Sequence, residues 1–491
     1  MYLLGIDIGT SSIKVSVVDA SSGNAIVTVQ YPDIESPVTS LHNGWAEQSP
    51  EMWWEHVQLA ILKANATKKY NASDIIAIGI AYQMHGLVMV DKDKKVLRDS
   101  IIWCDSRAVE IGDDAFKNIG EAYCLSHLLN SPGNFTAAKL AWVKENEPEI
   151  YQRIDKILLP GDFIAMKLTG EITTTVSALS EGIFWDFKNN CISETILNYF
   201  DFDISIFPSV LPVFTEHGIL TTNIAASLSL KAGIPVSYKA GDQPNNAFSL
   251  NVLEPGEVAA NAGTSGVIYG VGDSLTFDTA SRINNFAHVN HAHQNNRLGM
   301  LLCINGTGIM NSWAKKWIGD ALNYDEMNAA ALSIPFGSEG LQVIPFGNGA
   351  ERIFNNKTIG AHLLNLNLNK HTSAHIYKAV QEGIVFAFRY GLDIMRENNI
   401  RPTVIKAGIS NMFLSEIFVD TFVNTLDTPI ELFETDGSIG AAKGAGVGIG
   451  FYKNAKEAFI NFKPIREHAP NKANIYNDSY LNWKESLNKF I

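Results

Sequence analysis

The chain has 491 residues, of which 46% are hydrophobic and 18% are charged, and its net charge is −13. This length exceeds one ordinary hydrophobic core, and the composition is that of a globular protein. The acidic balance disfavours a nucleic-acid surface, which needs clustered Lys and Arg, so we expect small-molecule partners. No segment reaches the ~18 apolar residues of a membrane span, and the N-terminus lacks a basic region. We therefore expect a cytoplasmic protein that does not bind membranes.

A β-hairpin is predicted at the start of the chain. Apolar, strand-like runs at residues 3–7 and 13–18 flank the turn Gly9-Thr10-Ser11. A tight turn with glycine, hydroxyls and backbone N–H groups suits a phosphate chain. Asp7 stands just before the turn, and an acid beside a polyphosphate is best explained by a bound cation. Mg²⁺ held largely through water is the expected ion.

The next elements alternate between helix and strand. Ser49 and Pro50 predict the start of a helix over residues 51–64. An apolar strand at residues 74–82 then delivers Gln83-Met84-His85-Gly86 at its end, where functional residues often lie. A strand-like stretch at residues 96–103 leads to Asp105 and Arg107, which either brace the site as an ion pair or contact a ligand.

A second strand end carries Asp242. The apolar strand at residues 234–241 precedes it, and Pro244 fits the first position of a helix. The carboxylate would then lie near a helix N-terminus, which favours negative charge. A capping role is the structural alternative to a catalytic one.

The opening hairpin has a second copy 254 residues later. Residues 256–260 and 266–271 flank Gly263-Thr264-Ser265, with no equivalent of Asp7. Two such turns facing each other could clamp a phosphate chain from both sides, which predicts a nucleotide cleft. The spacing predicts two domains of similar size, over residues 1–250 and 251–491.

The second half continues the α/β alternation. A helix is predicted at residues 374–398, a strand at 403–408 and a helix at 413–424. The glycine-rich run at residues 440–450 shows neither a convincing preceding strand nor a convincing later acid of a dinucleotide loop. Close packing of a helix against its neighbours is the better interpretation of that run.

Together these features resemble the FGGY carbohydrate kinases, and within that family they are most similar to the xylulokinases. The similarity runs from Tyr2 to about Lys453. It rests on the two Gly-Thr-Ser turns, on Gly241-Asp242, and on GWAEQSPEMWWE, YQMHG, IIWCDSR, NFTAAKLAWVKENEPEI and KILLPGDFIAMKLTGE. The resemblance implies an α/β fold of two RNase H-like domains, as in actin, hexokinase and Hsp70, with an interdomain cleft.

The resemblance also implies roles for the motif residues. Asp242 would be the base that receives the sugar hydroxyl proton, and Asp7 would organise Mg²⁺ and the transferred phosphoryl group. Met84, His85 and Gln243 would join Asp242 at the sugar. The ATP phosphates would meet the two turns and the adenosine a later loop, through Gly9, Thr10, Ser11, Gly263, Thr264, Ser265, Gly408 and Asn411.

Two positions depart from the family pattern. Gln243 replaces the Asn that usually follows the base in xylulokinases, and glycerol kinases share this Gln. The adenosine loop, commonly Gly-Gly-Gly-Ala, here is Ala407-Gly408-Ile409-Ser410-Asn411. The change to Gln243 affects the shape of the expected sugar pocket. The change in the adenosine loop affects which nucleotide the protein prefers and how tightly it binds.

The implied reaction is ATP-dependent phosphorylation of a ketopentose, foremost D-xylulose at O5. A kinase for another ketose or polyol, of the ribulose or glycerol type, is the nearest alternative. An actin-like or chaperone-like ATPase module and a sugar-binding regulator without activity are more distant ones. The expected partners are the sugar and ATP, and a homodimer is an allowed assembly.

Overall fold

Two mixed β-sheets in this computed structural model share one topology. The structure describes residues 1–319, 321–471 and 473–491. The first sheet has the order β13-β5-β1-β2-β3 and the second β16-β17-β15-β14-β20-β21-β22. In each, three antiparallel neighbours (β1-β2-β3 and β14-β15-β17) continue into two parallel ones (β5-β13 and β20-β21). The repeated Gly-Thr-Ser turn therefore reflects a repeated five-strand unit.

Both Gly-Thr-Ser turns close the hairpins that the sequence predicts. The strands of the first sheet are β1 (Tyr2–Ile8), β2 (Ile13–Asp19), β3 (Ala25–Tyr31), β5 (Ile75–Tyr82) and β13 (Val236–Gly241). Those of the second are β14 (Val258–Ala262), β15 (Gly266–Gly272), β16 (Asn284–Ala287), β17 (Leu298–Ile304), β20 (Ile405–Gly408), β21 (Ile430–Phe433) and β22 (Arg466–His468).

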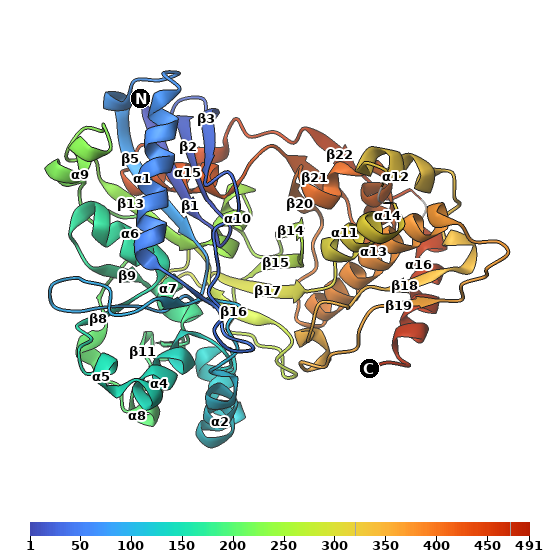
Figure 1. Cartoon of the computed structure of the whole chain (residues 1–491), viewed down its shortest axis with the longest axis horizontal. Coiled ribbons are helices and arrows are strands. Elements are labelled where there is room, and N and C mark those ends of the chain that lie inside the picture. The colour runs from blue at the N-terminus through green and yellow to red at the C-terminus, as the bar shows by residue number, and fades with distance from the viewer. Residues whose placement is uncertain (320, 472) are drawn as a thin grey trace.

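Helices cover both faces of the first sheet, which is why β1 and β5 are continuous apolar runs. The helices α1 (Pro50–Ala66) and α6 (Pro160–Thr169) pack against this sheet. The predicted start of α1 is confirmed, although the Ser49 side chain caps no backbone group. The helix α15 (Gly437–Gly448) also packs on this sheet, far from its sequence neighbours, as Figure 1 shows.

Glycines allow α15 to lie unusually close to the sheet. A Cβ added to Gly79 of β5 would lie 1.9 Å from the backbone oxygen of Ala441, and one added to Gly5 of β1 would lie 1.8 Å from that of Ser438. Neither position has room for a side chain. The prediction that residues 440–450 form a closely packed helix is confirmed as far as Gly448, where α15 ends.

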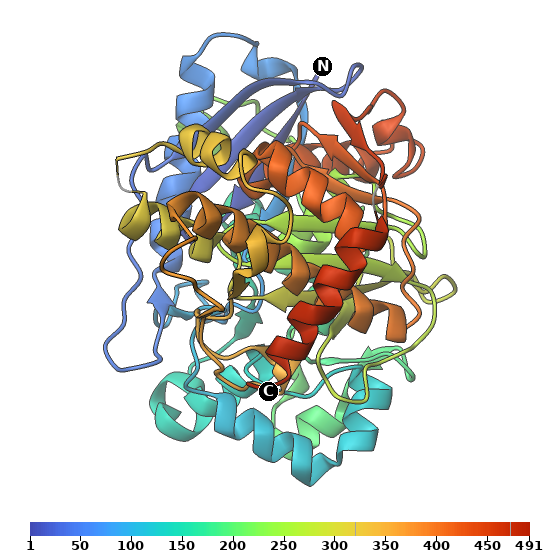
Figure 2. The same cartoon turned by 90° about the vertical axis from the view of Figure 1, so that its right-hand side faces the viewer.

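The second sheet packs against α13 (Ser373–Glu397), which agrees with the prediction to within one residue at each end. The helix α14 (Glu416–Leu426) starts later than predicted because residues Asn411–Leu414 form a separate 3₁₀ turn, η6. The helix α16 (Ala473–Leu487) crosses the outer side of this half, in front in Figure 2. The other helices here are α11 (Gly308–Ile318) and α12 (Tyr324–Leu332).

Shorter elements complete the chain. The predicted strand at residues 96–103 is reduced to β7 (Ser100–Ile101), which pairs with β4 (Glu47–Gln48). The remaining strands are β6 (Val88–Val90), β8 (Lys156–Leu158), β9 (Thr173–Thr175), β10 (Trp185–Asp186), β11 (Cys191–Ile192), β12 (Ser209–Leu211), β18 (Gln342–Ile344) and β19 (His362–Leu364). The remaining α-helices are α2 (Val109–Ile119), α3 (Glu121–Tyr123), α4 (Thr136–Asn146), α5 (Pro148–Tyr151), α7 (Val176–Glu181), α8 (Glu194–Phe200), α9 (Thr222–Ser227) and α10 (Asp242–Ser249).

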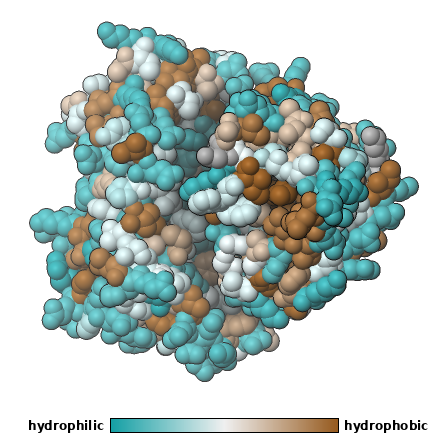
Figure 3. Space-filling view, turned by 45° about the vertical axis from the view of Figure 1, so that its right-hand side comes forward, coloured by the Kyte–Doolittle hydropathy of each residue, from teal (hydrophilic) through white to brown (hydrophobic). Residues whose placement is uncertain are grey.

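A groove separates the two halves on the face shown in Figure 3. In the part of the chain that the structure describes, no helix is both long and apolar enough to cross a membrane.

Candidate active site

Three neighbouring strands bring the two predicted acids to one edge of the first sheet. Tyr82, the last residue of β5, is in register with Ile8 of β1 on one side and with Gly241 of β13 on the other. Asp7 lies one residue before Ile8 and Asp242 one residue after Gly241. The carboxyl ends of parallel strands are where α/β proteins usually bind ligands.

Asp7 lies against the first turn of α15. A Cβ added to Gly437 would lie 2.3 Å from the Asp7 carboxylate, so any larger residue there would force that carboxylate to move. Burial and the nearby charge of Asp436 raise the pKa of Asp7 to about 6, and Lys14 opposes this shift. Asp7 therefore occupies β1 itself, before the turn, in a crowded acidic environment.

Asp242 is the first residue of α10, with Gly241 as the N-cap. The predicted helix start at Pro244 is two residues too late, since Pro244 occupies the third helical position. Burial and the charge of Asp7 raise the pKa of Asp242 to about 7. The two carboxylates thus repel each other across the sheet edge.

The acids fit a divalent cation. Mutual repulsion raises the pKa of Asp242, and a cation beside the acids would relieve it. Carboxylate oxygens are the ligands that Mg²⁺ prefers, together with water and phosphate. The donor set is therefore compatible with the predicted magnesium ion at Asp7.

Met84 and His85 lie beside the strand end that leads to Asp242. A Cβ added to Gly241 would lie 2.7 Å from Met84 Cγ, so the buried Met84 side chain packs directly on that backbone. His85 has a left-handed backbone (φ 63°), and its Nδ1 lies 2.9 Å from the backbone oxygen of Glu181. Burial and the charge of Lys139 lower the pKa of His85 to about 3. The ring is therefore neutral, with Nδ1–H donating and Nε2 left as an acceptor.

Two residues that support this site were missed from the sequence. Lys139 is fully buried and donates to the backbone oxygens of His85 (2.9 Å) and Ile102 (3.0 Å). Glu181 is also fully buried, and a Cβ added to Gly241 would lie 2.5 Å from its Oε2. Lys139 stands in the family stretch NFTAAKLAWVKENEPEI, but no sequence pattern marks the burial of either residue, because burial depends on contacts with distant segments.

Glu181 is held in its neutral form. Burial, followed by the charge of Asp242, raises its pKa well above the ordinary value, while the nearby Tyr82 hydroxyl opposes the shift. Neither carboxyl oxygen has a hydrogen-bond partner of good geometry among the described residues. A buried carboxylic acid thus stands between His85 and Asp242.

Hydrogen bonds within the hairpin and from neighbouring side chains hold the first Gly-Thr-Ser turn in place. Gly9 N–H donates to the backbone oxygen of Ser12 (3.0 Å). The Thr10 hydroxyl donates to Gln83 Oε1 (3.2 Å) and accepts from Trp103 Nε1 (2.9 Å). Ser11 is exposed at the tip. The Thr10 side chain is thus occupied, whereas the tip remains accessible.

The second turn borders a cavity of about 380 Å³ in the other half of the molecule. Gly263 and Thr264 line it together with Asn411, whose side-chain nitrogen would lie 3.6 Å from a Cβ on Gly263. Its other lining residues come mostly from α11, α12 and η6. Among the described residues, the lining does not include Ser265 or Gly408. Gly408 instead ends β20 and accepts a hydrogen bond from Ser410 N–H (2.9 Å).

Asp105 and Arg107 form a buried ion pair of 2.7 Å, which favours the bracing interpretation. Arg107 also pairs with Glu47 at 2.7 Å and lies 3.8 Å from the Trp45 ring centroid. The Arg107 guanidinium is therefore paired with two carboxylates of the protein, Asp105 and Glu47.

Comparison with known proteins agrees with this geometry. The FGGY family of carbohydrate kinases, N-terminal domain, matches residues 2–249. The chain is 27% identical to a xylulose kinase of Escherichia coli (strain K12), over 94% of this chain and 92% of that protein. It is 28% identical to a xylulose kinase of Staphylococcus xylosus, over 97% of this chain and 98% of that protein.

Solved structures share the whole fold. A xyloylose kinase from Brucella ovis gives a TM-score of 0.88 at 25% identity, over 100% of this chain and 99% of that one. A glycerol kinase from Plasmodium falciparum with ADP also gives 0.88, at 19% identity, over 100% of this chain and 98% of that one.

The repeated sheets and the match to carbohydrate kinases define a sugar kinase with the actin and hexokinase type of fold. The chain belongs to the FGGY family of carbohydrate kinases. The predicted family, fold and enzyme class are confirmed, and the alternative of an actin-like or chaperone-like ATPase module is not supported.

Proposed function

We propose that this kinase transfers the γ-phosphoryl group of ATP to O5 of D-xylulose, giving D-xylulose 5-phosphate and ADP. The observation that carries the proposal is the packing of Met84 on Gly241, the residue before Asp242, at the carboxyl ends of β5 and β13, with His85 next to Met84 in the chain. The similarity to xylulose kinases over nearly the whole chain supports the choice of sugar.

Asp242 acts as the base in this proposal. Its pKa of about 7, raised by burial and by Asp7, makes it a stronger proton acceptor than an ordinary aspartate. A loose phosphoryl-transfer transition state needs only late acceptance of the hydroxyl proton. Asp242 therefore aligns O5 first and takes its proton as the bond to phosphorus forms.

His85 and Met84 select the sugar. The neutral His85 ring offers Nε2 as an acceptor for a sugar hydroxyl, while Met84 supplies an apolar wall. Pockets for small ligands usually combine a few placed polar groups with apolar surface in this way. Gln243 follows the base and is the second polar group that we place at the sugar.

ATP is proposed to span the groove. The phosphates would meet the backbone amides of Thr10 and Ser11 on one side and of Gly263, Thr264 and Ser265 on the other. Gly9, whose own N–H is bonded to Ser12, would contribute a residue without a side chain beside the phosphates. The adenosine would occupy the 380 Å³ cavity beside Asn411, with Gly408 supporting the loop. Mg²⁺ near Asp7, when bound, neutralises charge on the β- and γ-phosphates.

A kinase for another ketose or for a polyol is the second candidate. The residue that favours this second candidate is Gln243, because glycerol kinases share a Gln at that position. Release of ADP should be measured with D-xylulose, D-ribulose, L-ribulose, L-xylulose and glycerol. We expect the highest kcat/KM with D-xylulose; a clear preference for glycerol or a ribulose would overturn the choice of sugar.

The base is tested by Asp242→Asn. We expect kcat to fall by about 10²–10⁴-fold, the usual range for loss of general acid–base catalysis. Asp93→Asn, in an exposed loop, is the control and should retain full activity. Near-normal turnover by Asp242→Asn, in protein that still folds by circular dichroism, would contradict the mechanism.

A further inference from the structure

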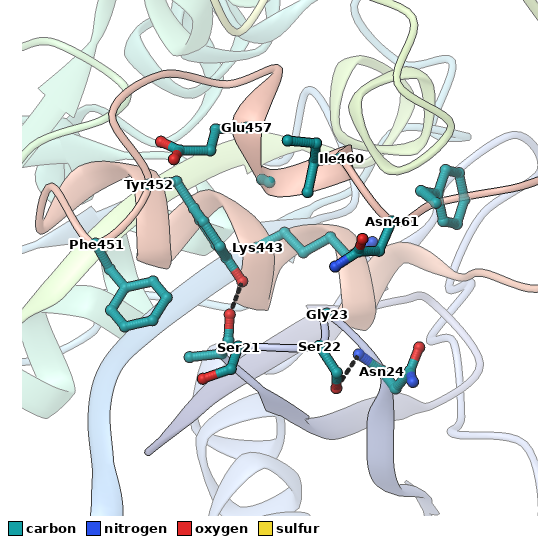
Figure 4. Close-up of a pocket in the computed structure, with 13 residues that line it drawn as sticks. Ser21, Ser22, Gly23, Asn24, Lys443, Phe451, Tyr452, Glu457, Ile460 and Asn461 are labelled. Atoms are coloured by element: carbon teal, nitrogen blue, oxygen red, sulfur yellow. Dashed lines mark hydrogen bonds between the residues drawn. The ribbon is translucent and has the colours of Figure 1, made fainter.

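A cavity of about 280 Å³ lies on the side of the first sheet away from the sugar site. It is formed by the β2–β3 turn, by α15 and by the chain that follows α15 (Figure 4). The proposed reaction uses none of its residues. Its lining consists of Ala20, Ser21, Ser22, Gly23, Asn24, Lys443, Phe451, Tyr452, Glu457, Ala458, Ile460, Asn461 and Phe462.

Lys443 of α15 is the unusual member of this lining. Its side chain is only 2% exposed, and its Nζ would lie 3.8 Å from a Cβ on Gly23. The ammonium lies over the rings of Phe459 (4.6 Å) and Phe462 (4.3 Å). Within the described residues, Lys443 makes no ion pair and no hydrogen bond.

A buried ammonium without an anionic partner is energetically costly. The two phenyl rings recover part of that cost through cation–π attraction, but they satisfy none of the three N–H donors. Burial lowers the pKa of Lys443 to about 8, so the group is still mostly charged at neutral pH. The site therefore lacks an anion that would complete it.

The surroundings define the size and chemistry of that anion. Figure 4 shows Lys443 extending toward Asn461, while Phe451, Tyr452 and Ile460 provide apolar surface. The backbone N–H groups of the neighbouring turn are already used, since those of Ser21 and Ser22 donate to Asp19. Recognition of charge thus depends on a single ammonium.

We propose that this cavity binds a small organic carboxylate, with its carboxylate on Lys443 and its apolar body against the aromatic side chains. One cation matches one negative charge. Glu457 lines the cavity, and Asp19 accepts hydrogen bonds from Ser21 and Ser22 of the lining. These two acids would repel a phosphate dianion more strongly than a monoanion. The apolar walls likewise favour an organic ligand over an inorganic one.

Binding can be measured directly by titration calorimetry with phenylacetate, phenylacetamide and inorganic phosphate. We expect saturable binding of phenylacetate, with phenylacetamide and phosphate about tenfold weaker or more, as the loss of a charged hydrogen bond predicts. This result does not depend on kinase activity, so it is separate from the proposed reaction.

Three variants localise the binding. Lys443→Met keeps the length of the side chain but removes its charge, and should weaken phenylacetate binding about tenfold or more. Asn461→Asp, an exposed position beside the ammonium, should also weaken binding while leaving the core intact. Lys456→Met, at an exposed lysine paired with Glu254, is the control and should bind as the unchanged protein does.

Several results would overturn the proposal. These are absence of saturable phenylacetate binding, equal affinity for phenylacetamide, tighter binding of phosphate, or unchanged affinity in both Lys443→Met and Asn461→Asp. Thermal unfolding of each variant separates loss of the site from loss of the fold.

Discussion

Glu181 shows how one buried side chain can influence both stability and the active site. It lies between the residues proposed to bind the sugar and the base, and it remains protonated because burial and Asp242 disfavour its charge. In the unfolded chain the same side chain ionises with an ordinary pKa near 4.5. Folding above that pH therefore requires Glu181 to take up a proton, which costs free energy.

This cost predicts that Glu181→Gln becomes more stable relative to the unchanged protein as the pH rises. A group whose pKa is raised on folding contributes its full stability below the unfolded pKa and loses it as the pH increases. The difference in the free energy of unfolding should grow with pH above about 4.5, by at most about 1.4 kcal/mol for each pH unit, as long as Glu181 stays protonated in the folded protein. Urea unfolding at pH 5.5, 6.5 and 7.5 measures it.

The control for this experiment is Glu171→Gln at an exposed position, whose stability difference should stay constant with pH. A constant difference for Glu181→Gln would show that Glu181 is ionised in the folded protein. Since Gln is neutral like the protonated acid, Asp242 keeps the same electrostatic neighbour in the variant.

For single residues, the sequence predicts the site residues that stand in motifs. It does not predict the buried residues that support those site residues. Asp7 lies at the end of a recognisable strand, and Met84, His85 and Asp242 follow such strands, so their common edge could be predicted. Glu181 and Lys139 lie in ordinary helical segments, and their charges give no hint of burial. Only the distant segments that pack over them make these residues part of the site.

The helix α15 shows what could and could not be predicted from the sequence for a whole element. Its small residues predicted close packing, but its partner could not be predicted, because α15 lies in the second half of the chain and packs on the first sheet. The Gly79 and Gly5 backbones touch it directly. Its first turn also meets Asp7, so displacement of the helix should disturb the proposed metal site.

Gly79→Ala is therefore expected to destabilise the protein by about 3 kcal/mol, at the upper end of ordinary overpacking. The new methyl group would lie 1.9 Å from the Ala441 backbone oxygen, and a backbone atom cannot move aside as a flexible side chain can. Chemical unfolding provides the measurement. Gly272→Ala is the matched strand control, because its Cβ would lie 3.4 Å from Met300 Sδ. Equal stability of the two variants would show that α15 can shift freely.

The start of α10 marks the limit of local patterns. A proline alone does not locate the first residue of a helix, because Pro244 is tolerated anywhere in the first turn, where N–H groups lack helical partners. The structure begins α10 at Asp242, which places the acid inside the helix instead of before it. Sequence could predict the helix but not the orientation of its first side chain.

At the scale of the whole molecule, the two repeated sheets separate the proposed ligands. Asp7, Met84, His85 and Asp242 belong to the first sheet, whereas the 380 Å³ cavity is built by the second turn, α11, α12 and η6. Each copy of the Gly-Thr-Ser turn belongs to its own sheet, the first between β1 and β2 and the second between β14 and β15. The sugar and the adenosine should therefore respond independently to changes in the two halves.

Asn411→Gly tests this independence. Asn411 has a left-handed backbone (φ 52°), which glycine also adopts easily, so the variant removes the amide without straining the loop. Loss of one hydrogen bond of about 1 kcal/mol should raise the KM for ATP about fivefold and leave the KM for the sugar unchanged. Asn399→Gly, another exposed left-handed asparagine, is the matched control. Steady-state kinetics with each substrate varied in turn measures the two KM values. An equal rise in both would mean that the two halves do not bind their ligands independently.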